Sequence, residues 1–424
     1  MRKKLLILGG APLHCGVVET AKEMGIETYV TDNIPAEYSP AKQIADHDWD
    51  FDIYEYSKIA DRCREEGIDG VLMAHLNPCQ LPYQKICEML GLPCFATADQ
   101  YKIFTNKKLF LDACTENGVD IIEQYREADF LIDNPNIKYP LYVKPSDSRG
   151  SRGQAICRSY AEMSKAIMIA KEESSNDEVI IERYMEGCQD IQLTYFVMDG
   201  EPYLYCIGDK HNGTEEEGHQ GSVIAGITPS FNTKAILNDA NKKISKMLKN
   251  LKLKNTPVFI QGFLDGDKLR VYDPALRLPG FLYERNLRKA TGFDTYRSMI
   301  NFALTGRFLP ELKNVEATRD MSGKLSVSIW IFIREGTITE IRGVEELRKN
   351  PAVVRIDERY RVGSVIEDWR DVRNSYCEIA FICEDVNEAK AMIRLIYETV
   401  RIFDEHGQDM KIAIFNPDKI DGVA

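Results

Sequence analysis

Three residues that could bind a metal and a phosphate lie between Phe259 and Gly280, in the segment FIQGFLDGDKLRVYDPALRLPG. The pattern predicts two strands joined by a tight turn at Asp265-Gly266-Asp267. Gln261 lies on the first strand, Asp273 ends the second, and Arg277 follows it. Paired strands hold side chains within about 5 Å, so two oxygen ligands could share a hard cation. The arginine could then clamp a phosphate, although a surface hairpin with an Asp/Arg pair is the alternative interpretation.

A second phosphate-binding pattern occurs in YVKPSDSRGSRG, residues 142–153. Lys144 lies on a predicted strand, which fixes the direction of its ammonium group. The loop after it carries Ser148, Gly150, Ser151 and Gly153, and small residues let backbone N–H groups cover a polyphosphate. A surface loop without a ligand is the alternative. Lys107, at the start of a predicted helix, is the second candidate cation.

The segment VIIERYMEG, residues 179–187, predicts an apolar strand that runs into a short connector. Such a connector can bind an adenine edge through backbone groups, while Tyr184 or Met185 packs on the ring. Taken alone, the same residues also suit an ordinary buried strand.

Composition limits the classes of protein that the chain can represent. It has 424 residues, 44% hydrophobic and 28% charged, which suits a globular protein of about two or three domains. The net charge of −12 argues against nucleic-acid and anionic-membrane partners. No apolar run approaches the roughly 18 residues of a membrane helix. Eleven scattered cysteines without zinc-type spacing predict reduced thiols and a cytoplasmic location.

Hydrophobic periodicity predicts a mixed fold, α/β followed by α+β. Residues 1–100 alternate strand and helix, with one helix at Tyr56–Glu66, which indicates a Rossmann-like domain with a parallel sheet. Residues 101–308 are rich in strands, including a half-buried antiparallel strand at Asp190–Thr194 and a helix at Lys234–Leu251. Within them, about 138–187 forms a small subdomain. Residues 309–424 predict a small α+β domain with a helix at Val386–Phe403.

The opening GGAPLHCG invites a dinucleotide-binding interpretation, with Asp32 as the ribose-binding acid. The glycines do not have the G-x-G-x-x-G spacing, so we expect a Rossmann-like turn that faces the cleft without binding a dinucleotide. The chain also lacks the GxxxxGK[ST] sequence of P-loop enzymes.

Together, these motifs resemble the ATP-grasp superfamily over about residues 1–305. The matching order is a Rossmann-like domain, NKKLF with Lys107, the strand with Lys144, the connector VIIERYMEG, and the hairpin. The layout is most similar to carboxylate–amine ligases and to biotin-carboxylase and purine-carboxylase relatives. The C-terminal region is similar in style to the third domain of amino-acid ligases of this group.

The resemblance implies ATP and Mg²⁺ as cofactors, with Mn²⁺ as the alternative metal, and it implies roles for individual residues. Lys107 and Lys144 would contact the ATP phosphates, with Lys144 catalytic, under the loop residues Ser148, Gly150, Ser151 and Gly153. The adenine would be lined by Glu182, Arg183, Tyr184 and Met185, and the ribose held by Asp190 or, alternatively, Gln189. Gln261 and Asp273 would be the metal ligands, and Arg277 would be catalytic, facing the transferred phosphate. Lys210 and His219 would lie near phosphate or substrate, an exposed loop position being the alternative for His219.

The hairpin departs from the family pattern Glu-x-Asn-x-Arg. Here Asp273 replaces the glutamate, and Ala275 replaces the asparagine ligand. One certain carboxylate remains, which Mg²⁺ tolerates because water and ATP oxygens complete its shell. A nearby acid such as Asp265 is a candidate additional ligand.

The expected function is therefore that of an ATP-dependent ligase, which activates a small carboxylate as an acyl phosphate and joins it to an amine. A bicarbonate-dependent carboxylase and a non-catalytic ATP-binding protein are the alternatives, and a dinucleotide oxidoreductase is the least favoured. The expected partners are a small carboxylate and an amine, with no nucleic acid and no membrane. A homodimer is the expectation from base rates.

Overall fold

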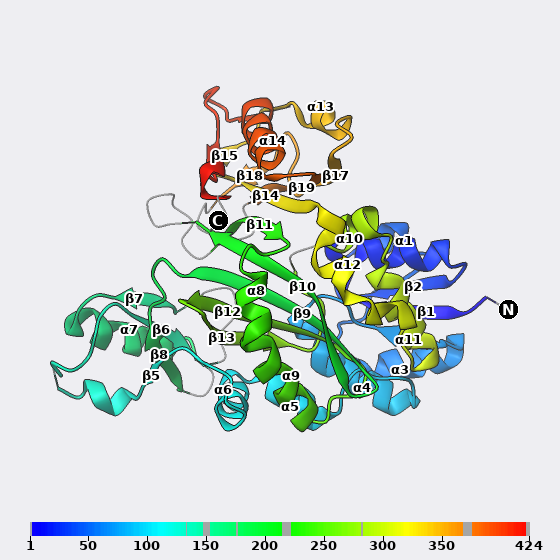
Figure 1. Ribbon diagram of the computed structural model, residues 1–424. Coiled ribbons are helices and arrows are strands. Elements are labelled where there is room, and N and C mark those ends of the chain that lie inside the picture. The colour runs from blue at the N-terminus through cyan, green and yellow to red at the C-terminus, as the bar shows by residue number, and fades with distance from the viewer. Residues whose placement is uncertain are drawn as a thin grey trace.

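The computed structural model describes residues 2–132, 134–146, 153–174, 177–213, 222–280, 283–367 and 375–420. Three principal sheets organise the chain (Figure 1). The N-terminal sheet lies on one side, a small four-stranded sheet lies on the other, and a nine-stranded sheet lies between them and continues into the C-terminal region.

The N-terminal sheet is parallel, in the order β3-β2-β1-β4, as the alternation of strand and helix predicted. Its hydrophobic strands are buried because helices cover both faces. The strands are β1 (Lys4–Leu8), β2 (Glu27–Thr31), β3 (His47–Trp49) and β4 (Gly70–Leu72), and the helices are α1 (Cys15–Glu23), α2 (Pro40–Ile44), α3 (Tyr56–Glu66) and α4 (Gln80–Leu90). The helix predicted near Tyr56 to Glu66 is confirmed as α3.

The small sheet has the order β5-β8-β6-β7 and carries a hydrophobic core of its own. Helix α7 (Tyr160–Glu172) buries Met163, Ala166 and Ile167 against this sheet. The strands are β5 (Gln124–Tyr125), β6 (Leu141–Pro145), β7 (Ala155–Cys157) and β8 (Val179–Arg183).

The large sheet has the order β13-β12-β9-β10-β11-β14-β19-β17, and β21 pairs with β14. The antiparallel strand predicted at Asp190–Thr194 is confirmed within β9, but this strand is central and buried on both faces, so the expected half-burial was wrong. The strands are β9 (Gln189–Met198), β10 (Glu201–Asn212), β11 (Val223–Thr228), β12 (Thr256–Asp265), β13 (Lys268–Ala275), β14 (Leu325–Ile333), β17 (Val353–Glu358), β19 (Ser375–Cys383) and β21 (Lys411–Ile412). Strands that precede residue 309 and strands that follow it belong to this one sheet. The domain boundary predicted between residues 308 and 309 remains a prediction.

Helices surround the large sheet, and two of the predicted helices differ from the observed ones. The helix expected over Lys234–Leu251 is broken at Asp239, whose backbone is not helical (φ −126°, ψ −70°). The helix expected to reach Phe403 ends at Thr399, because the following residues pair with another strand. These helices are α5 (Ala98–Thr105), α6 (Lys107–Glu116), α8 (Thr233–Asn238), α9 (Ala240–Asn250), α10 (Glu284–Thr291), α11 (Thr295–Thr305), α12 (Val315–Arg319), α13 (Val344–Arg348) and α14 (Val386–Thr399). Short strands complete the C-terminal region: β15 (Gly336–Thr337), β16 (Glu340–Arg342), β18 (Val365–Ile366) and β20 (Arg401–Phe403).

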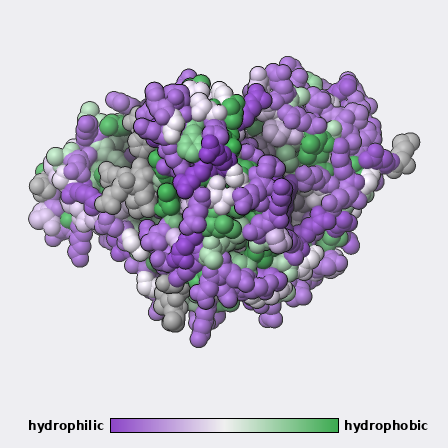
Figure 2. Space-filling model, turned by 90° about the horizontal axis from the view of Figure 1, so that it is seen from above, coloured by the Kyte–Doolittle hydropathy of each residue, from purple (hydrophilic) through white to green (hydrophobic). Residues whose placement is uncertain are grey.

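The face seen in Figure 2 is mostly hydrophilic, with its hydrophobic residues scattered among polar ones. Over the described ranges, no helix combines the length and apolar character that crossing a bilayer requires.

Candidate active site

A cleft of about 1550 Å³ separates the small sheet from the large sheet. Strands β6, β7 and β8 line one wall, and strands β9, β10, β12 and β13 line the other. Asn77 and Pro78, which precede α4, and Gln80 and Leu81, which begin it, also line the cleft. Of the residues proposed from the sequence, the cleft brings together Lys107, Lys144, Glu182, Arg183, Tyr184, Met185, Asp190, Lys210, Gln261 and Asp273.

The predicted hairpin forms, with Gly266 at φ +60° in its turn. Gln261 and Asp273 are directly opposite each other on β12 and β13, and Gln192 is opposite Gln261 on β9. The sequence had not pointed to Gln192. An amide and a carboxylate on one face suit Mg²⁺ if nucleotide oxygens and water supply the other ligands. Among the described residues, no group of three or more His, Cys, Asp or Glu is arranged to hold a metal without such help.

Asp265 is engaged in salt bridges through one of its oxygens, which disfavours it as an additional metal ligand. One carboxylate oxygen lies 2.5 Å from the Arg183 guanidinium and 2.6 Å from the Arg270 guanidinium. The hydrogen bonds from these two arginines lower the pKa of Asp265. Arg183 therefore ties the connector to the tip of the hairpin.

The two candidate lysines approach the cleft from different elements. Lys107 begins α6, whose N-cap is the Asn106 side chain, and its Nζ lies 3.8 Å from Asp273. Burial lowers the pKa of Lys107, and the charge of Lys144 acts in the same direction. Lys144 is buried and lies 2.5 Å from Glu182. Two cations held close together in a partly dry cleft favour an anionic ligand.

The connector after β8 places Tyr184 and Met185 on the wall of the cleft. Met185 is buried, and the Tyr184 ring lies 6.2 Å from that of Tyr142. The Glu182 carboxylate accepts a hydrogen bond from Lys144, so it is poorly placed to bind adenine as the resemblance implied. Backbone groups and the two apolar side chains remain the candidates for adenine.

Asp190 and Lys210 form a buried ion pair of 2.9 Å. Two further side chains, which the sequence did not single out, bind the same carboxylate: Tyr272 at 3.1 Å and Asn212 at 3.0 Å. Only pairing of β9 with β10 and the approach of β13 bring these groups together, so no local signal could have identified them. Asp190 has little hydrogen-bonding capacity left for a ribose in this arrangement.

Arg277 is 8% exposed, and a loop of the N-terminal region holds it in place. Its Nε donates to Asn77 Oδ1 at 2.5 Å, its Nη1 donates to its neighbour's carbonyl, and its guanidinium lies 5.1 Å above the Phe259 ring. Burial lowers its pKa to about 10. Among the described residues no carboxylate forms an ion pair with this guanidinium, so an anionic ligand would complete its surroundings.

The same N-terminal segment, residues 74–80, forms hydrogen bonds with the backbone on either side of Arg277. Leu276 N–H donates to the Gln80 side chain at 2.9 Å, and Leu278 N–H donates to Ala74 O at 2.9 Å. His75 contacts Pro279 O at 2.7 Å. The sequence had not indicated this role for residues 74–80.

Five of the expected phosphate- or substrate-facing residues need separate mention. Ser148, Gly150, Ser151 and His219 lie outside the described residues. Gly153 is described; its φ is +68°, and a Cβ there would lie 2.9 Å from side-chain atoms of Pro145 and Glu173. Glycine is therefore required at that end of the loop.

The C-terminal segment also reaches the cleft, which the sequence did not predict. Phe415 and Lys419 line it, and the Phe415 ring lies 4.9 Å from the ring of His211 on β10. Burial lowers the pKa of His211 to about 4, so this imidazole is neutral.

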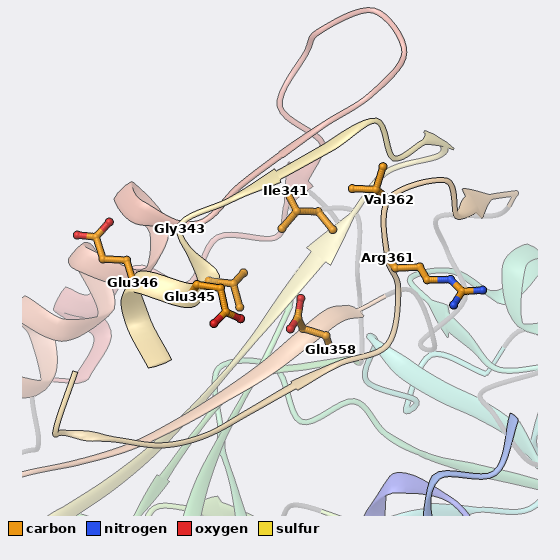
Figure 3. Close-up of a pocket in the computed structure, with 8 residues that line it drawn as sticks. Ile341, Gly343, Glu345, Glu346, Glu358, Arg361 and Val362 are labelled. Atoms are coloured by element: carbon orange, nitrogen blue, oxygen red, sulfur yellow. The ribbon is translucent and has the colours of Figure 1, made fainter. Parts of the chain in front are cut away.

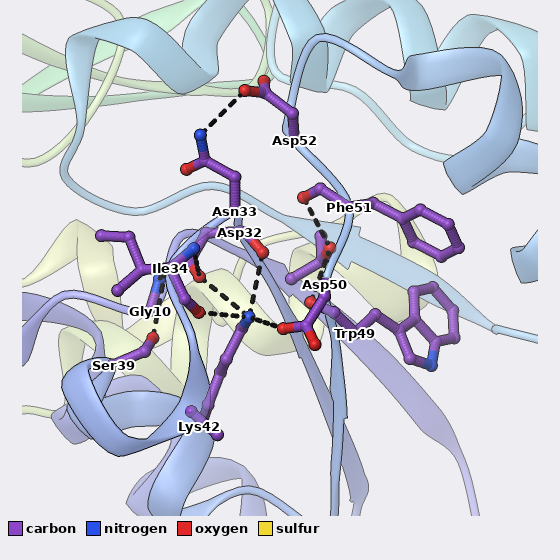
Figure 4. Close-up of polar contacts among 12 residues, drawn as sticks. Gly10, Asp32, Asn33, Ile34, Ser39, Lys42, Trp49, Asp50, Phe51 and Asp52 are labelled. Atoms are coloured by element: carbon purple, nitrogen blue, oxygen red, sulfur yellow. Dashed lines mark hydrogen bonds and ion pairs between the residues drawn. The ribbon is translucent and has the colours of Figure 1, made fainter.

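Asp32 makes structural contacts within the N-terminal region (Figure 4). Its carboxylate accepts from Gly10 N–H at 2.7 Å and from the Ser39 hydroxyl at 3.1 Å, and it lies 3.0 Å from Lys42, which also contacts Asp50. A Cβ on Gly10 would lie 1.8 Å from Ser39 Oγ. With its oxygens occupied in this way, Asp32 is poorly placed to bind a ribose, which disfavours the dinucleotide alternative.

A smaller hollow of about 360 Å³ lies in the C-terminal region (Figure 3). Its lining residues fall between Ile341 and Val362 and include Glu345, Glu346 and Glu358. It shares no lining residue with the cleft. Its acidic lining does not suit a nucleotide.

A small sheet that faces a larger antiparallel sheet across a lysine-lined cleft, next to a Rossmann-like sheet, is the ATP-grasp fold. Residues 106–253 match the family described as carbamoyl-phosphate synthase L chain, ATP binding domain. Residues 329–403 match the L-amino acid ligase C-terminal domain 2. The fold and these matches confirm the resemblance to the ATP-grasp superfamily.

Relatives and solved structures agree with this class. The formate-dependent phosphoribosylglycinamide formyltransferase of Haloquadratum walsbyi is 28% identical over 221 residues, 50% of this chain and 53% of the relative. The chain thus spans about half the length of that relative. The L-amino acid ligase from Bacillus licheniformis superposes with a TM-score of 0.78 at 18% identity, covering 95% of this chain and 99% of that one. The biotin carboxylase domain of the Hydrogenobacter thermophilus 2-oxoglutarate carboxylase, in complex with MgADP, ADP and bicarbonate, gives 0.76 at 18%, covering 98% and 92%. At these identities the solved structures show the fold.

Proposed function

We propose that this protein is an ATP-dependent ligase that joins a small carboxylate to an amine. The observation that carries the proposal is that Asp273 lies within electrostatic reach of both Lys107 and Arg277, and that Lys107 is also within electrostatic reach of Lys144. Lys107 lies 3.8 Å from that carboxylate, and Arg277 is buried nearby with no acid paired to it in the described ranges. Phosphoryl transfer depends on such positioned cations. The match to an ATP binding domain over residues 106–253 supports ATP as the nucleotide.

In the proposed reaction, a carboxylate oxygen of the first substrate attacks the γ-phosphorus of ATP, and the bond from that phosphorus to the ADP oxygen breaks. The nitrogen of the amine then attacks the carbonyl carbon of the acyl phosphate, the bond from that carbon to the phosphate oxygen breaks, and the nitrogen loses a proton. Lys107 and Lys144 would hold the β- and γ-phosphates, and Arg277 the transferred group. Gln261 and Asp273 would hold Mg²⁺, which neutralises charge on the phosphates.

The proposal is tested by following phosphate release from ATP and Mg²⁺ in the presence of carboxylate pools, with hydroxylamine as the nucleophile. Hydroxylamine converts an acyl phosphate into a hydroxamate, which forms a coloured complex with ferric iron and so reports the intermediate. Hydroxamate that depends on one acid would support the ligase. Phosphate release that requires bicarbonate would replace the ligase by a carboxylase. ATP binding without release in any pool would favour a binding protein.

The expected partners are small molecules, and the homodimer remains a prediction. Size-exclusion chromatography with light scattering, at several protein concentrations, tests the dimer.

A further inference from the structure

A histidine outside the cleft holds the loop that carries Arg277. We call residues 276–280, which follow β13, the Arg277 loop. His75 lies between β4 and α4, is 2% exposed and is not among the described residues that line the cleft. Its Nδ1 lies 2.7 Å from Pro279 O, and its Nε2 lies 3.0 Å from the hydroxyl of Tyr296 on α11. One buried imidazole therefore bridges the Arg277 loop and α11.

These two contacts define which ring nitrogen of His75 carries the proton. A carbonyl oxygen only accepts, so Nδ1 donates to Pro279 O. Burial holds the pKa of His75 well below its usual value, and the charge of Arg277 acts in the same direction, so the ring is neutral. Nε2 is then unprotonated and accepts from the Tyr296 hydroxyl. With the proton on Nε2 instead, Nδ1 and Pro279 O would be two acceptors facing each other.

Tyr296 is a fixed donor because helix α1 packs against its ring. The residue is 5% exposed, and a Cβ on Gly16 of α1 would lie 2.6 Å from its Cε2 atom. Glycine at position 16 therefore leaves the room that the ring occupies. The rings of Tyr296 and His75 meet edge-on, with centroids 5.7 Å apart and planes at 81°. The position of His75 is thus set from two sides, by α11 and by the Arg277 loop.

The hydrogen bond from His75 reaches Arg277 through a proline. The ring of Pro279 fixes its φ, so only ψ separates the Pro279 carbonyl from the peptide that joins Pro279 to Leu278. Holding that carbonyl therefore restrains the peptide. The Leu278 carbonyl belongs to this peptide and accepts from Arg277 Nη1 at 2.6 Å. Because Leu278 N–H is itself bound to Ala74 O, two adjacent parts of the Arg277 loop are fixed, and the carbonyl between them orients the guanidinium.

We propose that His75 is a positioning residue for the proposed ligase reaction, which holds the Pro279 carbonyl and, through the peptide before it, the guanidinium of Arg277. This inference rests on the proposed function and adds to it a residue that acts on Arg277 from outside the cleft. His75 touches no substrate in this role. A displacement of about 1 Å in a catalytic group can lower turnover about a hundredfold, so loss of one hydrogen bond next to Arg277 is sufficient to be measured.

Two variants of His75 separate its hydrogen bond to Pro279 from its bulk. His75→Leu removes both hydrogen bonds, whereas His75→Asn keeps a side-chain N–H close to the place of Nδ1. His75→Leu should lower kcat for hydroxamate formation about tenfold, while KM for ATP stays close to that of the wild type. His75→Asn should recover most of the loss. The kcat is expressed per site that binds a fluorescent ATP analogue, so unfolded protein does not contribute. His47→Leu is the matched control, because His47 lies on the edge strand β3 and its side chain is 47% exposed.

The second measurement locates the proton on His75. Nitrogen NMR spectra of protein labelled at its six histidines distinguish the two ring nitrogens, and the His75 signals are those lost in His75→Asn. The wild type should show the proton on Nδ1, and a proton on Nε2 would overturn the inference. Tyr296→Phe removes the donor to Nε2 and should lower kcat, although less than His75→Leu does.

An unchanged kcat in His75→Leu, with hydroxamate formed by the wild type, would overturn this inference and leave the ligase proposal standing. An equal loss of kcat in His75→Leu and His75→Asn would mean that the hydrogen bond to Pro279 is not responsible, and would also overturn it. If the wild type forms no hydroxamate with any acid, the ligase proposal fails, and this inference fails with it. Should His75→Leu lose its fold, as judged by circular dichroism, Tyr296→Phe decides the question, since an unchanged kcat in that variant would overturn the inference.

Discussion

Replacing Lys144 by methionine should affect stability and catalysis separately, because this lysine has two roles. It neutralises Glu182 at 2.5 Å inside the protein, where the two side chains are 6% and 5% exposed. Removing one partner of a buried pair leaves an uncompensated charge, at a cost of about 3–5 kcal/mol. Lys144→Met should therefore lower the free energy of unfolding by roughly 3 kcal/mol in urea denaturation.

The double variant Lys144→Met/Glu182→Gln separates the two roles. It removes both charges, so it should recover most of the lost stability. It should not recover turnover, because the phosphate contact is still missing; losing one such electrostatic contact costs kcat about a hundredfold or more. A coupled assay for ADP measures this turnover. Lys108→Met is the control, since Lys108 is 65% exposed and lies 3.9 Å from Glu178.

Two results would refute this reasoning. Recovery of both stability and turnover in the double variant would make Lys144 a structural residue only. A single variant as stable as the wild type would mean that the pair with Glu182 contributes nothing to folding.

Three further predictions concern Arg277, the metal and pH. Asn77→Ala removes the acceptor that orients Arg277 and should lower kcat about tenfold. Nucleotide affinity, measured with a fluorescent ATP analogue, should stay close to that of the wild type. An equal loss of ATP affinity would contradict this prediction. Asp273→Asn should raise the Mg²⁺ concentration for half-maximal phosphate release by about tenfold, and EDTA should abolish release from the wild type; an unshifted Mg²⁺ titration argues against this ligand. Burial raises the pKa of Glu284 to about 8 in the folded protein, while Arg355 lowers this pKa and Glu378 raises it. As pH rises toward 8, the carboxyl ionises in the unfolded chain before it ionises in the folded protein, so the folded protein loses stability. The melting temperature of Glu284→Gln should therefore gain on that of the wild type between about pH 5 and 8; a constant difference would indicate an ordinary pKa.

Much of the fold and part of the site followed from the sequence. Helix α3 was predicted at its observed ends, and the hairpin formed with Gln261 opposite Asp273. Both depend on local rules, hydrophobic periodicity in the helix and a glycine-containing turn in the hairpin, which act over about ten neighbouring residues. The sequence singled out Lys107 and Lys144 because each lies in a short motif, and both line the cleft.

The tertiary structure decided which acidic side chains already have partners within the protein. Asp265 looked free for a metal, but Arg183 and Arg270 take its carboxylate. Asp190 looked free for a ribose, but Lys210 and Tyr272 surround it. A local pattern shows that an acid is present, whereas its neutralisation depends on strands that approach from elsewhere.

What the sequence by itself determined about this protein is therefore the order of its elements, the hairpin, and the lysine-bearing motifs. What only the tertiary structure decided is which distant residues meet them. Asn77 holds Arg277 across 200 positions of the chain, and Phe415 reaches the cleft from the C-terminal segment. The physical reason is that such contacts come from packing whole elements together, and no spacing within one segment encodes them.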